Sequence, residues 1–141
     1  MNRLGVHLLD LPDEILLIIL KKLDNIDVLY SLLNINNERL YILSQDKIFS
    51  NILNFGSIDN NSRIDRFRID ILPKIRDNVK YFILKPILME SVLLAADYRN
   101  LTKLKLLDFK EEIALNYFTG EYSNRRRVAL NRTDSTIFLF R

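Results

Sequence analysis

Residues 79–106 read VKYFILKPILMESVLLAADYRNLTKLKL, and one apolar pattern occurs twice in this stretch. Residues 79–84 follow the spacing apolar-x-x-apolar-x-apolar, and residues 101–106 repeat it 22 positions later. The alternation at the end of each copy is typical of a strand, because successive side chains of a strand point to opposite faces. Residues 87–96, between the copies, predict a short helix. The stretch therefore predicts a strand, a helix and a second strand.

The spacing of the two copies resembles that of leucine-rich repeats. These repeats are about 20–29 residues long, and their Leu-x-x-Leu-x-Leu pattern turns alternate side chains of a parallel strand inward. A third copy would need apolar residues at positions 123, 126 and 128, where the chain has Ser, Arg and Val. We therefore expect the repeat to end after Phe118 and residues 119–141 to form an irregular or truncated tail. Its apolar residues 137–140 predict an edge strand or a truncated repeat.

The segment before the repeat predicts one further helix and a boundary. Apolar residues recur at helical spacing over residues 64–75. Pro73 should end or kink this helix, because proline lacks the backbone N–H and clashes with the preceding turn. Residues 54–62, NFGSIDNNS, are the most turn-rich stretch of the chain, so we expect a boundary there.

The N-terminal part predicts three short, closely linked helices. The sequence Leu-Pro-Asp-Glu opens the first, over residues 12–23, because proline suits the first helical position and carboxylates suit the first turn. Asp and Asn at positions 24–25 are typical caps for a second helix over residues 26–33, and a third is expected over residues 38–43. The first helix is apolar on all sides, which indicates a partner in addition to an internal core.

The composition favours an intracellular globular chain. Of its 141 residues, 48% are apolar and 28% are charged, which excludes disorder for most of the chain. The absence of Cys excludes disulfides, thiolate metal sites and Cys nucleophiles. No apolar run approaches the roughly 20 residues of a transmembrane helix, and the N-terminus lacks a secretory signal. We expect a cytoplasmic or nuclear protein with no membrane partner.

Residue types that carry catalysis are scarce. His7 is the single histidine, so histidine-based triads and metal sites cannot assemble. The carboxylates at 13–14 and at 111–112 are adjacent pairs, and helix neighbours diverge by about 100°, so neither pair shares one site. No glycine lies in a phosphate-binding pattern. We expect neither an enzyme nor a bound metal or cofactor.

Basic residues leave a small nucleic-acid-binding protein open as an alternative. Residues 61–110 carry a net positive charge, and Arg125–Arg127 follow in the tail. Such clusters can neutralise phosphates. Acidic residues are interleaved with the first cluster, so a solvated helix face is the stronger interpretation of it. The basic residues concerned are Arg63, Arg66, Arg68, Lys74 and Arg76.

The order of residues near the N-terminus resembles the F-box. Residues 11–14 match its Leu-Pro-x-Glu opening, residues 15–23 match its apolar first helix, and residues 23–28 match its Leu-Asp-x-x-Asp-Leu junction. Residues 40–41 are Leu-Tyr where the family commonly has a Trp. Residues 59–118 resemble the degenerate leucine-rich segment that follows the box in many F-box proteins.

This resemblance implies a mainly α fold with a small α/β part, in which a three-helix F-box over residues 8–50 precedes a short leucine-rich-repeat-like solenoid fragment over residues 59–118. It implies a non-catalytic subunit that binds the Skp adaptor of a cullin-RING ubiquitin ligase and recruits a protein target. A truncated, non-functional copy is a further alternative. The residues expected to contact the adaptor are Leu11, Pro12, Ile15, Ile19, Leu20, Val28 and Leu32. The residues expected to contact the target, on the strand face, are Lys80, Tyr81, Ile83, Lys103 and Lys105.

Overall fold

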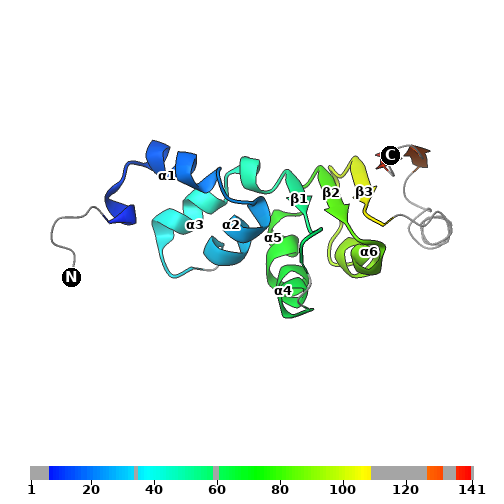
Figure 1. The fold of residues 1–141 in the computed structure, drawn as a ribbon, viewed down its shortest axis with the longest axis horizontal. Coiled ribbons are helices and arrows are strands. Elements are labelled where there is room, and N and C mark those ends of the chain that lie inside the picture. Colours follow the sequence, from blue (N-terminus) through cyan, green and yellow to red (C-terminus); the bar gives the residue numbers. More distant parts are fainter. Residues whose placement is uncertain (1–6, 34, 59–60, 109–126, 132–135, 141) are drawn as a thin grey trace.

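The computed structural model describes residues 7–33, 35–58, 61–108, 127–131 and 136–140. Helices lie before and beside a small sheet, and the elements follow one another along the longest axis of the molecule (Figure 1). The expectation of a mixed chain, helical with a small β part, is confirmed.

Five short helical elements precede the first strand. They are η1 (Leu8–Asp10), α1 (Asp13–Leu20), α2 (Asn25–Leu32), α3 (Glu38–Ser44) and η2 (Lys47–Phe49). Helix α1 is shorter than predicted because Pro12 is its N-cap, with an extended backbone (ψ 157°), and Lys21 is its C-cap. Asp24 caps α2 without a side-chain hydrogen bond. Instead, Nδ2 of Asn25 donates to the carbonyl oxygens of Ile48 (3.1 Å) and Ile52 (2.9 Å), which ties α2 to the following chain.

The helix predicted over residues 64–75 is interrupted as Pro73 requires. It consists of α4 (Asn61–Arg66), the π-helix η3 (Phe67–Ile71) and α5 (Leu72–Ile75). The N–H of Leu72 donates to the carbonyl of Phe67, five residues earlier, which marks the wider turn. Pro73 then lies in the first turn of α5, where its missing N–H is tolerated. The expected kink therefore takes the form of a π turn.

The five strands of the described residues form one sheet with the order β1-β2-β3-β5-β4. They are β1 (Ile52–Asn54), β2 (Tyr81–Leu84), β3 (Lys103–Leu106), β4 (Arg127–Asn131) and β5 (Thr136–Phe140). Strands β1, β2 and β3 are parallel, and α6 (Pro86–Leu93) links β2 to β3. Each residue of β2 pairs with the residue 22 positions later in β3, as in Phe82 with Leu104. The repeat seen in the sequence is thus the register of the parallel pair.

Strand β1 adds a third parallel unit that the sequence analysis did not predict. Leu53 pairs with Phe82, so the first two units are offset by 29 residues. Ser50 then stands where the other two copies have Val79 and Leu101, and all three are buried. A polar residue at the first position of the pattern therefore concealed this copy.

The described part of the tail forms two paired strands. An irregular or truncated segment was expected over residues 119–141. Strand β5 pairs antiparallel with β3, and β4 pairs antiparallel with β5. Ile137 and Leu139 alternate into the core, which provides the two-residue period that a half-buried strand needs. Strand β4, not β5, is outermost in the sheet. Residues 109–126 and 132–135, including part of that tail, lie outside the described residues.

One hydrophobic core joins the N-terminal helices to the sheet. Tyr30 of α2 stacks on Phe67 with a centroid distance of 6.0 Å, and Phe67 meets the edge of Phe55 at 5.3 Å. The row continues to Phe82 at 5.9 Å and to Tyr98 at a further 5.0 Å. A continuous row of aromatic rings therefore runs from α2 across the turn-rich stretch to the residues after α6.

Candidate protein-interaction surfaces

Helix α1 exposes an apolar face. Ile15, Ile18 and Ile19 lie on one side of it, at the i, i+3 and i+4 positions, and 42%, 52% and 37% of their surfaces are accessible. Leu16 and Leu20, on the opposite side, are buried in the core. Below, the α1 apolar face means these three isoleucines. The helix thus uses its apolar residues in two directions, one inward and one outward.

The seven residues expected to contact the adaptor fall into three groups. Pro12, Ile15 and Ile19 are exposed. Leu11 and Leu32 are partly buried against the core. Leu20 and Val28 are buried, with 6% and 1% of their surfaces accessible. Because both side chains point into the hydrophobic core, they are core residues and not surface contacts. Ile18 was missed, since its position in the sequence did not show which side of an all-apolar helix would be outward.

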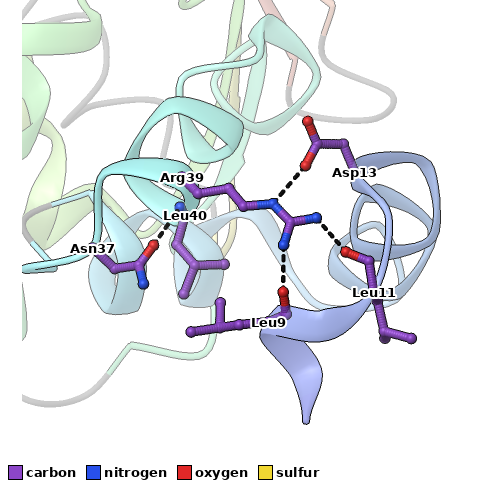
Figure 2. A network of polar contacts seen from close by, with 6 residues as sticks. All are labelled: Leu9, Leu11, Asp13, Asn37, Arg39 and Leu40. Carbon is purple, nitrogen blue, oxygen red and sulfur yellow. Dashed lines mark hydrogen bonds and ion pairs between the residues drawn. The ribbon is translucent and has the colours of Figure 1, made fainter. Parts of the chain in front are cut away.

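Arg39 of α3 holds the segment that leads into α1 (Figure 2). Its Nε donates to Oδ1 of Asp13 at 2.7 Å, its Nη1 donates to the carbonyl oxygen of Leu9, and its Nη2 donates to that of Leu11. Helix α3 itself begins where the side chain of Asn37 accepts from the N–H of Leu40. One guanidinium therefore serves three acceptors and connects α3 to residues 9–13, a role that no local sequence signal indicates.

The second surface is the side of the sheet that faces away from α4, α5 and α6 (Figure 1). The strand register arranges its residues in two rows that cross the strands, because paired residues share a face. We call these rows the outer sheet face. The first row is Ile52, Tyr81, Lys103, Phe138 and Ala129, and the second is Asn54, Ile83, Lys105, Thr136 and Asn131. Thr136 is the buried member of the second row.

Four of the five residues expected to contact the target lie together on the outer sheet face. Tyr81 and Ile83 of β2 lie beside Lys103 and Lys105 of β3. The Nζ of Lys103 is 5.8 Å from the centre of the Tyr81 ring, within the range of a cation–π contact. Lys80 is exposed and lies one residue before β2. Ile52 and Phe138 were not predicted to lie on this face, because neither β1 nor the pairing of β5 was expected.

The basic residues of α4 and η3 pack against neighbouring residues. The guanidinium carbons of Arg63 and Arg66 lie 4.7 and 4.4 Å from the centre of the Tyr30 ring. Arg63 also pairs with Asp27 at 2.9 Å, and Arg68 pairs with Asp65 at 3.2 Å. These contacts connect α4 to α2 and supply nearby negative charge, so the three arginines do not form an open phosphate-binding row. Arg125 and Arg126 lie outside the described residues.

Within the described ranges, no group of three or more His, Asp or Glu side chains is placed to hold a metal ion. No helix among the same residues is long and apolar enough to cross a membrane. Comparisons with protein-family models, with curated proteins and with solved structures find no match. The two surfaces described above are therefore the basis for assigning a function.

Proposed function

We propose that this protein is a non-catalytic adaptor that binds the Skp subunit of a cullin-RING ubiquitin ligase through α1–α3 and recruits a protein target through the sheet. In this proposal, residues 8–50 act as an F-box and the strand–helix units that follow act as a short leucine-rich-repeat-like receptor. The single observation that carries it is the α1 apolar face.

Apolar side chains exposed to water gain free energy when a partner covers them. Burial of apolar surface contributes about 25 cal/mol per Å², so a partner that covers three large aliphatic side chains on one helix face would gain free energy from that contact. Leu8 and Leu9 of η1 are exposed as well. Because Arg39 fixes residues 9–13 to α3, the segment leading into α1 is held in place before any partner binds.

The chemistry of such an adaptor is proximity. A target held beside a ubiquitin-loaded enzyme reacts faster because its effective concentration is raised, and this requires no catalytic residue in the adaptor itself. The cytoplasm or the nucleus, where this ligase machinery operates, is the corresponding location.

A capture experiment with a purified Skp adaptor tests the proposal. The wild-type chain should retain the adaptor, and Ile19→Lys should weaken binding by at least about tenfold, because a charge would be buried in the interface. Ile87→Lys is the matched control, since Ile87 on α6 is 85% exposed and lies away from α1. Failure of the wild-type chain to bind, or equal binding by the two variants, would refute the proposal.

A further inference from the structure

The outer sheet face carries charge of one sign. Its two charged residues among the ten positions are Lys103 and Lys105, and no Asp or Glu occurs in either row. The two lysines are two residues apart on one strand, which separates their Cα atoms by about 6.6 Å. Lys80, one residue before β2, is exposed but lies outside the two rows. Like charges this close are mutually unfavourable until an anion lies between them.

The described ion pairs do not engage these lysines. The ion pairs Arg39–Asp13, Arg63–Asp27 and Arg68–Asp65 lie among the helices. Lys103 instead lies against the Tyr81 ring. Neither row offers these lysines an acidic partner among the described residues, which favours an external acidic ligand.

Apolar side chains flank the lysines and indicate which class of acidic ligand the outer sheet face would bind. Tyr81 and Phe138 stand on either side of Lys103 in the first row, and Ile83 stands beside Lys105 in the second. Ile52, at the β1 end of the first row, is 50% exposed. A face that alternates ammonium groups with apolar patches suits a chain that carries both carboxylates and apolar side chains. A duplex would need more phosphate contacts than two or three lysines supply.

We propose that the outer sheet face binds an acidic peptide segment, whose carboxylates pair with Lys103 and Lys105 while its apolar side chains pack on Tyr81 and Ile52. This inference rests on the proposed function, in which the same face receives the target, and it adds the chemical class of that target. Charge complementarity determines which segments are accepted, and the apolar contacts hold them.

Selection from a displayed library of random peptides tests this with the full chain alone. Wild type should enrich peptides rich in Asp and Glu. The double variant Lys103→Glu, Lys105→Glu should lose that enrichment or select basic peptides instead. The control Lys47→Glu, Arg76→Glu makes the same change in net charge at two exposed residues outside the rows, and should keep the wild-type preference. Circular dichroism would verify that both variants fold.

An enriched peptide is then titrated by fluorescence anisotropy. Its affinity should fall by about tenfold or more in the face variant and when its carboxylates are replaced by amides, and little in the control variant. Enrichment without acidic bias, or equal effects in both double variants, would overturn the inference. So would tighter binding of duplex DNA with the same lysine dependence. Ile19→Lys should leave peptide binding intact, so loss of adaptor binding and loss of peptide binding are distinguishable.

Discussion

Arg39 makes three side-chain hydrogen bonds, more than any other residue of the described N-terminal helices. Its guanidinium donates to one carboxylate and to two backbone carbonyls, and it is anchored on α3. The planar fork of a guanidinium can serve several acceptors at once, whereas an ammonium group is a single point of charge. Arg39 is therefore the residue on which the position of η1 relative to α3 depends.

Arg39→Ala should release η1 and lower the free energy of unfolding by about 1–3 kcal/mol, because a charge-assisted network is lost and two carbonyls lose their donor. Hydrogen exchange should show lost protection at the amides of Asp10 and Leu11, which donate within this segment. Arg39→Lys should be intermediate. The control is Arg68→Ala, which removes an exposed ion pair and should change stability by less than about 1 kcal/mol. Equal effects of the two alanine variants would contradict this role.

Tyr98 makes a buried hydrogen bond, in which its hydroxyl donates to the carbonyl of Val92 at 2.6 Å. Tyr98→Phe keeps the ring in its place beside Phe82 and removes the hydroxyl that makes this bond, so it should cost about 1–2 kcal/mol in a denaturant titration. Tyr41→Phe is the comparison, because the half-buried Tyr41 hydroxyl has no hydrogen bond among the described residues. A change as large in Tyr41→Phe would show that the Val92 bond is not the cause.

The three parallel strands place equivalent side chains at equivalent depths. Ser50, Val79 and Leu101 occupy the first buried position of each copy. The backbone repeats as well: the N–H groups of residues 80 and 81 donate to the carbonyl of residue 51, and those of residues 102 and 103 donate to that of residue 80. Side chains vary between the copies, while the hydrogen-bond pattern at the start of each strand pair is the same.

Val79→Ser should cost about 2–4 kcal/mol, because it removes buried methyl groups and buries a hydroxyl in a site shaped for an apolar side chain. Ser50→Ala, at the equivalent position of the first copy, should change stability by less than about 1 kcal/mol, since its hydroxyl makes only a long contact of 3.5 Å with the carbonyl of Lys47. Urea titrations of both variants measure the difference. Similar losses would mean that the two positions are not equivalent.

The molecule as a whole has one core and two outward surfaces of different character. The aromatic row passes from Tyr30 through Phe55 to Tyr98, so the N-terminal helices and the sheet share buried contacts. The α1 apolar face lies near one end of the long axis, and the outer sheet face lies further along it (Figure 1). A shared core keeps the spacing of the two surfaces constant, which an adaptor between two partners requires.

A shared core predicts cooperative unfolding. Helix α2 and strand β3 should lose structure at the same denaturant concentration, as followed by amide signals from each, because buried residues of both belong to one hydrophobic core. Phe55→Ala should lower the stability of both by about 3–5 kcal/mol. Separate transitions for the two elements, or a loss confined to the sheet, would show that the turn-rich stretch divides two independent units.

The candidate surfaces were predictable in part. Four of the five proposed target contacts lie on one face, because strand alternation and the 22-residue period place Tyr81 beside Lys103 without further information. The sequence did not distinguish exposed from buried residues among the expected adaptor contacts. Leu20 and Val28, which were expected to be contacts, are buried, and Ile18, which was not, is exposed. An all-apolar helix has no polar side to mark which direction is outward, so only the packing of neighbouring helices decides it.

The sequence by itself determined the elements with strong local signals: the helix after Leu11-Pro12, the strand pair at residues 79–106, and an interruption at Pro73. These depend on backbone chemistry and on short-range periodicity, which are readable in a single chain. Only the tertiary structure decided that β1 belongs to the sheet, that β5 pairs antiparallel with β3, and that Arg39 forms hydrogen bonds with residues 9–13. Each of these features depends on partners far away in the chain. Contacts between distant parts of the chain are not indicated by neighbouring residues in the sequence. Ser50 and Arg39 show this, because their roles depend on residues that only the folded structure brings next to them.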